Sequence, residues 1–286
     1  MGILPIQLMN GLFAASTLLL CSLGMVIIFG NMNVVNLAHG EFIMVGAYTA
    51  WFISAVARLP FVAAVAGAAL VAGLFGAVVE RVVIKRFYQR FEETLLATYA
   101  ISIIMTQIFR LGFSSMKKIV ELPVRGGFEI GSMTFPKYNL VIVAAAATAV
   151  GFVCLLFYKT PFGRRVRAIR QNRNMAMCLG INASATDTLS FGLGCALAGL
   201  AGAVTAPVKI VFPAMGASYL MDSFSTVVVG GVDSFIGTAA SSALISESTS
   251  VLGGFMSEVY AQIIVLVGII LILRFRPSGL FAKERR

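Results

Sequence analysis

Residues 36–42 read Asn-Leu-Ala-His-Gly-Glu-Phe and bring residue types capable of chemistry into an otherwise apolar part of the chain. This segment holds the only histidine of the sequence, His39, and the first charged residue, Glu41. A carboxylate at the centre of a membrane helix costs about 2.5–3.5 kcal/mol on insertion scales, so an acid there indicates function. The structural alternative is that Glu41 lies near a membrane face or in a solvated crevice and orients its neighbours. On a helix, His39 and Glu41 point to nearly opposite sides, whereas Glu41, Val45 and Tyr48 can share one face.

The same residues argue against an enzyme. The sequence contains no G-x-x-x-x-G-K-[ST] loop to hold nucleotide phosphates. His39 is the only histidine, so any Ser-His-Asp relay would have to use it. The four cysteines are scattered without C-x-x-C spacing, so we expect neither a metal site nor a disulfide.

The elements that must position these residues are membrane helices. The chain is 59% hydrophobic and 12% charged, with a mean hydropathy of +0.93, so it has too few charges to cover a soluble domain. Runs near the roughly 20 residues that a membrane helix needs predict an all-α polytopic membrane protein with about eight or nine transmembrane or partly spanning helices, in a single domain over residues 1–286. The predicted spans are 6–29, 36–57, 61–79, 94–112, 138–158, 188–208, 234–252 and 256–273, with a weaker one at 218–232.

The net charge of +10 fits membrane topology better than nucleic-acid binding, because the basic residues lie in the gaps between spans. Residues 80–93, 158–187 and the tail from 274 are predicted to be cytoplasmic, and 113–137 extracytoplasmic. Counting spans then puts the N-terminus outside, and a basic tail inside requires that 218–232 also crosses. We expect this segment to break near Gly230 and Gly231, as helices that line cavities can. The first apolar run lacks a basic leader and is too long for a cleavable signal, so it should remain in the mature protein.

The cytoplasmic segment 159–187 is the second informative region. Pro161 is expected to start a short basic helix with Val166 and Ile169 on one side, and Gly180 to stop it. Such a helix could lie on anionic lipid, or it could be the place where a partner ATPase acts.

Several motifs in order along the chain resemble the permease family of branched-chain amino-acid ABC transporters. They are the 36–42 segment, Gly46-Ala47-Tyr48, Leu179-Gly180-Ile181, Gly230-Gly231 and Arg276-Pro277-x-Gly279-Leu280-Phe281. Within that family, three stretches are most similar to the urea-transporter permease branch: Glu93 to Thr98, Gln171 to Ala176, and Tyr219 to Phe224.

The resemblance implies an ABC importer permease in a bacterial inner membrane. Its partners would be a second homologous permease, two ATP-binding cassette ATPases that bind ATP and Mg, a periplasmic substrate-binding protein and membrane lipid, with no cofactor and no nucleic acid on this chain. The ATPase-coupling residues would be Arg164, Arg167, Arg170, Asn172, Leu179, Gly180 and Ile181. The candidate substrate-pathway residues are Asn33, Asn36, His39, Glu41, Tyr48, Asp222, Ser223 and Thr226.

Urea is the expected substrate, and branched-chain amino acids or short amides are the alternative. Urea is small and neutral, so its path needs scattered donors and acceptors rather than a charge clamp, and the intramembrane polar residues are mostly neutral. An amino acid would need partners for its ammonium and carboxylate groups and an apolar pocket. A passive urea or ammonium channel and a purely structural subunit remain as other classes. Residues 36–41 and 221–224 each precede a Gly-containing apolar helix, which favours an internal repeat.

Overall fold

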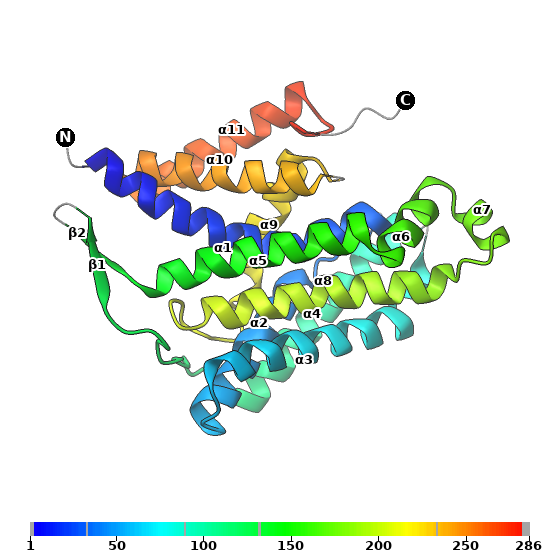
Figure 1. The fold of residues 1–286 in the computed structure, drawn as a ribbon, viewed down its shortest axis with the longest axis horizontal. Helices are drawn as coiled ribbons and strands as arrows, with labels where there is room; N and C mark the ends of the chain where they lie inside the picture. The colour runs from blue at the N-terminus through cyan, green and yellow to red at the C-terminus, as the bar shows by residue number, and fades with distance from the viewer. Residues whose placement is uncertain (1–2, 33, 89, 131–132, 233, 282–286) are drawn as a thin grey trace.

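The computed structural model describes residues 3–32, 34–88, 90–130, 133–232 and 234–281, and within them almost every element is a helix (Figure 1). The elements are α1 (Ile3–Met32), α2 (His39–Trp51) with a π-helical turn (Phe52–Val56), α3 (Phe61–Val82), a 3-10 turn (Ile84–Phe87), α4 (Phe91–Phe113), β1 (Gly127–Ile130), β2 (Met133–Pro136), α5 (Tyr138–Lys159), α6 (Pro161–Gln171), α7 (Arg173–Cys178), α8 (Ala183–Thr205), α9 (Gly216–Gly230), α10 (Phe235–Gly253) and α11 (Glu258–Phe275).

The predicted membrane spans are confirmed as helices. Six helices of the described residues are long and apolar enough to cross a membrane, or up to seven if the bent pair of α9 and α10 counts as one span. The segment predicted at 36–57 begins later than expected, because α2 starts at His39 and has only 13 residues. The weaker segment at 218–232 is α9, which ends at Gly230 and is followed by a bend of 119° into α10. The break expected near Gly230 and Gly231 is therefore present.

The helices form two similar sets that run in opposite directions. Helix α8 packs on α3, α2 and α1, and helix α1 packs in turn on α10, α9 and α8. Exchanging α1 with α8, α2 with α9 and α3 with α10 maps one set of contacts onto the other. Figure 1 shows α1 running from the end that carries β1 and β2 toward the end that carries α6 and α7, and α8 running the other way. This is the pattern of an inverted repeat.

The two sets meet where the short helices α2 and α9 begin. Gly40 in α2 lies directly against the backbone of Gly216 in α9, so a Cβ on either residue would overlap main-chain atoms of the other helix. The internal repeat predicted from residues 221–224 thus has the wrong register, because those residues lie inside α9 rather than before it. The counterpart of Gly40 is Gly216.

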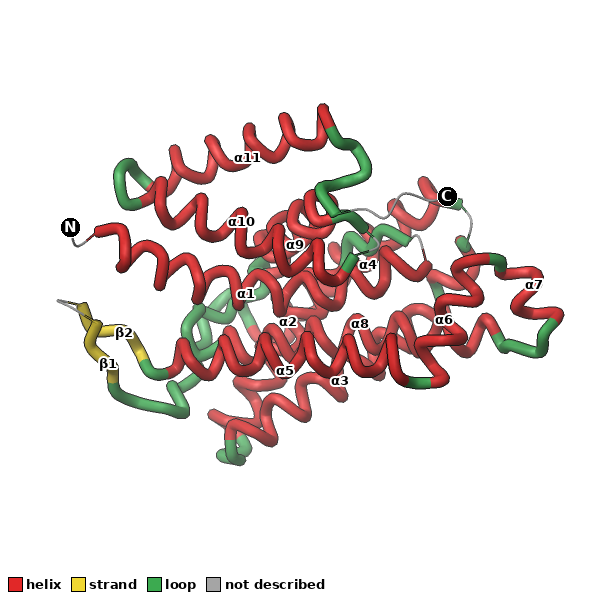
Figure 2. The backbone as a smooth tube through the Cα atoms, turned by 45° about the horizontal axis from the view of Figure 1, so that its top comes forward, coloured by secondary structure: helices red, strands yellow, loops and turns green. Residues whose placement is uncertain are grey.

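The two ends of the helix bundle carry different elements, and the basic segments predicted to be cytoplasmic lie at the end away from the predicted extracytoplasmic loop. One end carries the antiparallel pair β1–β2, in which Phe128 pairs with Phe135, and a two-way backbone pairing of Lys118 with Val211. The other end carries α6, α7 and the segment after α11 (Figure 2). The predicted extracytoplasmic loop and the predicted cytoplasmic regions lie at opposite ends.

Two sequence motifs that are far apart form one structural unit where α9 ends and the segment after α11 returns to it. The main-chain N–H of Leu280 donates to the carbonyl of Val229 at 2.8 Å, and that of Phe281 donates to Gly230 at 3.3 Å. Gly279 (φ 89°) and Gly231 (φ 96°) supply the left-handed backbone that this contact needs. These bonds satisfy carbonyls that the end of α9 would otherwise leave unpaired.

Candidate functional site

Asn36 shapes the turn that leads into α2. Its side chain is buried, its Oδ1 accepts the main-chain N–H of Ala38 at 3.0 Å, and its carbonyl accepts that of His39 at 3.1 Å. The turn is also fixed from α4, because Thr98 Oγ1 accepts the N–H of Leu37 at 3.2 Å. The two oxygens of Asn36 therefore hold the turn, whereas its buried Nδ2 has no partner among the described residues. The other asparagine predicted here, Asn33, lies outside the described residues.

His39 joins α2 to α1. The side chain is 0% exposed, and Nε2 donates to the carbonyl of Cys21 at 2.8 Å. This bond makes Nε2 the protonated ring nitrogen, since a carbonyl can only accept. Within the described part of the chain, Nδ1 has no hydrogen-bond partner. His39 is thus a packed tether between two helices.

Glu41 points from α2 toward a different helix, α4. It is 3% exposed, and Oε1 accepts the hydroxyl of Ser102 at 3.1 Å. The carboxylate also lies against Gly216, where a Cβ would come within 2.9 Å of Oε1. The second oxygen, Oε2, has no partner among the residues that the structure describes. His39 and Glu41 point in different directions, as predicted, because they face α1 and α4 respectively.

The face that Glu41 shares with Val45 and Tyr48 is confirmed. Val45 packs with Met105, and the ring of Tyr48 lies 5.0 Å from those of Phe109 and Phe113, so all three side chains meet α4. The hydroxyl of Tyr48 is buried and has no partner within the described ranges. The contact between α2 and α4 is therefore polar at Glu41 and aromatic at Tyr48.

The three predicted residues of α9 fall on different sides of that helix. Ser223 and Thr226 are buried, and Ser241 of α10 donates to the carbonyl of Thr226 at 2.6 Å. Asp222 is exposed and interacts electrostatically with Lys209, which is also exposed and follows α8. Ser223 and Thr226 thus face the packed interior, and Asp222 faces outward.

The structure does not gather the predicted pathway residues around one space. His39, Glu41 and Tyr48 lie in the core, whereas Asp222 lies on the surface with Lys209, which the sequence reasoning missed. A lysine after a long apolar run, close in sequence to the aspartate, was the signal available. Ser102 was missed because a serine in an apolar helix carries no mark of its partner. No group of three or more His, Cys, Asp and Glu residues in the described ranges could hold a metal ion.

The segment predicted to couple to an ATPase contains two helices rather than one. Pro161 is the first residue of α6, and Val166 and Ile169 are buried, as predicted. The chain breaks at Asn172, whose Oδ1 accepts the N–H of Met175 at 2.9 Å and so starts α7. Gly180 follows with φ 81°, the left-handed conformation that ends a helix.

The basic residues of this region are not equivalent. Arg164 is exposed, whereas Arg167 donates to the carbonyl of Phe157 and lies over the ring of Tyr158, so it holds α6 against the end of α5. Arg170 is half-buried and Ile181 partly so, and Leu179 is 76% exposed. The most exposed part of the region is therefore apolar as well as basic.

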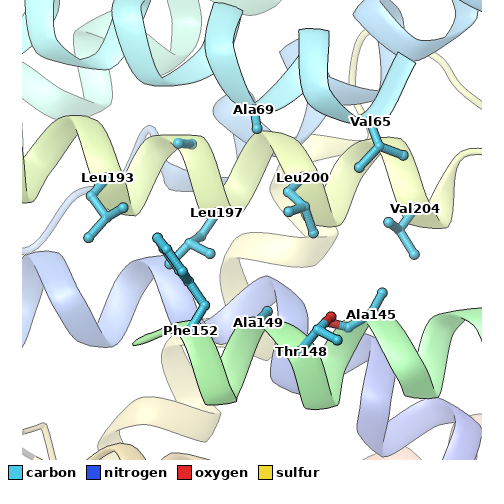
Figure 3. Close-up of a pocket in the computed structure, with 11 residues that line it drawn as sticks. Val65, Ala69, Ala145, Thr148, Ala149, Phe152, Leu193, Leu197, Leu200 and Val204 are labelled. Atoms are coloured by element: carbon cyan, nitrogen blue, oxygen red, sulfur yellow. The ribbon is translucent and has the colours of Figure 1, made fainter. Parts of the chain in front are cut away.

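One cavity of about 490 Å³ lies between α3, α5 and α8, as Figure 3 shows. Its lining is almost wholly apolar, with Leu197, Phe152 and Ala69 around it and Thr148 at one side. None of the predicted pathway residues borders it. It lacks the polar groups that a path for a polar solute requires.

Apolar helices in an inverted arrangement, buried polar tethers at the centre and a basic helical region at one end define a multi-pass membrane protein. Residues 7–273 match the family described as the permease component of branched-chain amino acid transport systems, and the chain belongs to this family. It is a permease subunit of an ABC importer in the inner membrane.

Among the relatives is the high-affinity branched-chain amino acid transport system permease protein BraD of Pseudomonas aeruginosa, 27% identical over 97% of this chain and 95% of that protein. The probable branched-chain amino acid transport permease protein LivH of Methanocaldococcus jannaschii is 28% identical over 93% of this chain and 89% of that protein. The ribose import permease protein RbsC of Bacillus subtilis is 38% identical, over 38% of this chain and 36% of that protein. No solved structure matches. The expected family is confirmed, and the urea branch is not supported.

Proposed function

We propose that this chain is the transmembrane permease subunit of an ATP-driven importer for branched-chain amino acids. The two full-length relatives named above carry that substrate in their names. The ribose permease, which is similar to part of this chain, is named for another kind of solute. The substrate therefore has to be argued from the charges of this chain.

The observation that carries the proposal is the pair Asp222 and Lys209. The two side chains are exposed and of opposite charge, and they attract each other without forming an ion pair among the described residues. An amino acid is a zwitterion whose ammonium group suits a carboxylate and whose carboxylate suits an ammonium group. Urea has no charge and gains little from such a pair. Asp222 and Lys209 thus favour the amino acid.

The urea-like stretches have structural explanations that weaken them as signs of substrate. Thr98, in the first stretch, holds the N–H of Leu37, and Asn172, in the second, caps α7. These roles concern the scaffold and not the solute. Asp222 belongs to the third stretch, where its charge favours an amino acid.

The exposure of Asp222 also supports a second permease. Helix α9, which carries Asp222, follows the candidate span α8 and forms one further candidate span together with α10. Charged side chains within a membrane protein face other protein or a water-filled cavity rather than lipid. We therefore place the homologous second subunit against the outward face of α9, with the translocation path between the two chains.

The surface that would meet the ATPases lies on α7. Met175 and Leu179 are four residues apart and strongly exposed, at 59% and 76%. Flexible apolar side chains such as methionine suit a contact that must adapt as a partner moves. Arg164 is exposed on α6, the helix that packs on α7, and adds positive charge to this region. The ATPases would bind ATP and Mg, and a periplasmic protein would deliver the substrate to the opposite end.

Uptake measured in cells that lack their own importers, with every partner subunit supplied, tests the proposal. We expect labelled leucine to be taken up and labelled urea to be excluded. Asp222→Asn should raise the half-saturating leucine concentration by about tenfold, the value of one charged hydrogen bond. Asp222→Glu is the matched control and should retain most of the uptake. Uptake of urea but not leucine would contradict the substrate assignment, and uptake without ATPases would indicate a passive channel.

A further inference from the structure

A buried polar cluster at the cytoplasmic end connects the coupling region to the membrane helices. Glu80, near the end of α3, is 0% exposed and accepts two hydroxyl groups. Thr188 of α8 donates to Oε2 at 2.6 Å, and Tyr88, just after the 3-10 turn, donates to Oε1. Both side-chain oxygens of Glu80 are thus hydrogen-bonded, as buried polar groups generally are.

The cluster continues into α7 through Arg173. Its Nη2 lies 2.6 Å from Oδ2 of Asp187, near the start of α8, and the Asp187 side chain is only 6% exposed. The guanidinium also lies over the ring of Tyr88, 5.6 Å from its centroid. Burial and the adjacent Glu80 carboxylate raise the pKa of Tyr88, so its hydroxyl keeps its proton and donates at any physiological pH. Arg173 therefore contacts α8 directly and α3 through Tyr88.

The two helices that Arg173 reaches lead to the centre of the bundle. Helix α8 packs on α3 and on α2. At Gly202 it approaches the carbonyl of Ile43 so closely that no Cβ would fit, and at Gly199 it lies against Gly46. Interiors packed this closely pass on a displacement instead of absorbing it. A shift of α7 thus has a continuous packed route along α8 to α2.

We infer that Arg173 is a positioning residue that transmits the movement of the ATPase-docking region to α3 and α8, with Asp187, Tyr88 and Glu80 as its partners. The inference rests on the proposed function, since it assigns a role within ATP-driven import. The inference assigns the binding of the ATPase and the transmission of its movement to different sides of α7. The exposed face of α7 binds the partner, and the buried side of α7 carries the movement inward.

The test uses the complete complex in proteoliposomes, with the ATPases and the binding protein present and labelled leucine as the probe. Two quantities are measured: leucine taken up and ATP hydrolysed. Arg173→Ala should lower the leucine transported per ATP by about fivefold, a typical coupling between contacting charged groups. Hydrolysis by the assembled complex should persist, because the docking face is intact. Arg173→Lys keeps the charge beside Asp187 but loses the planar guanidinium over Tyr88, so it should recover only part of the lost ratio.

Two further variants keep the inference testable if Arg173→Ala fails to assemble. Asp187→Asn retains the size of the side chain and removes its charge, and Tyr88→Phe retains the ring beneath Arg173 while removing the hydroxyl; both should lower the ratio. Arg81→Ala is the matched control. Arg81 follows Glu80 in the chain, is exposed and forms no ion pair in the described ranges. The leucine transported per ATP should therefore be unchanged in Arg81→Ala.

The outcomes separate the inference from the function on which it rests. A wild-type complex that hydrolyses ATP without transporting leucine, or transports without ATP, contradicts the proposed function. If the wild type is coupled and Arg173→Ala transports as much leucine per ATP as the wild type, the inference alone is wrong. If Arg173→Ala does not assemble, the same conclusion follows when both Asp187→Asn and Tyr88→Phe leave the leucine transported per ATP unchanged. Reduced assembly with a normal ratio in the assembled fraction also overturns it, since the cluster would then only stabilise the fold.

Discussion

Replacing Glu41 by Gln and by Leu separates the role of its shape from the role of its charge. Glutamine keeps one oxygen that can accept the hydroxyl of Ser102, and leucine removes it while filling a similar volume. Stranding a buried donor costs about 1–3 kcal/mol. Here the lower end applies, because a serine in a helix can turn its hydroxyl to the carbonyl four residues earlier. We therefore expect Glu41→Leu to lose about 1 kcal/mol of stability, too little to prevent folding.

The effect on transport should be larger than the effect on stability. Glu41 lies against Gly216, where α2 and α9 begin, so leucine changes the contact between the two short helices. We expect Glu41→Gln to retain much of the leucine uptake and Glu41→Leu to lose most of it, with both measured at matched membrane levels. Copurification of the partner subunits controls for assembly. If Glu41→Gln abolishes uptake as completely as Glu41→Leu in assembled complexes, the negative charge itself is required and the structural assignment is wrong.

Two other substitutions test the contacts that hold α2 in place. Gly40→Ala would push a methyl group into the backbone of Gly216, and overpacking of this kind costs about 1–3 kcal/mol, so the thermal midpoint in detergent should fall. Gly112→Ala, at a helical glycine with open space around it, is its control; a midpoint that fell equally in both would disprove the crossing contact. Thr98→Val keeps the shape of the side chain but leaves the N–H of Leu37 unpaired, which should cost about 1–3 kcal/mol of stability. Leucine uptake should fall by a larger factor than the small drop in the thermal midpoint alone would explain. Unchanged uptake would show that the turn does not depend on this bond.

The membrane helices could be predicted because apolar length is a local property of the sequence. The start and burial pattern of α6 also followed from local signals, namely Pro161 and the spacing of Val166 and Ile169. The break at Asn172 is harder to predict although asparagine is a strong N-terminal cap, because the basic residues continue across it without interruption. Sequence alone therefore predicts helices well and their interruptions less well.

The polar contacts could not be predicted in the same way. Glu80 meets Thr188 far along the chain, and nothing near either residue marks the pair. The role of His39 was open for a related reason: a lone histidine can be a ligand or a tether, and only the position of the Cys21 carbonyl decides. Pairings of this kind depend on the inverted arrangement of the helices, which short motifs do not specify.

The bonds from Leu280 and Phe281 to the end of α9 impose an order on biosynthesis. Helix α9 leaves the ribosome before α10 and α11, so its carbonyls at Val229 and Gly230 wait for a segment that is made only after α11. Until then those groups need water or a temporary partner. The end of α9 therefore gains these two hydrogen bonds only after α11 has been made.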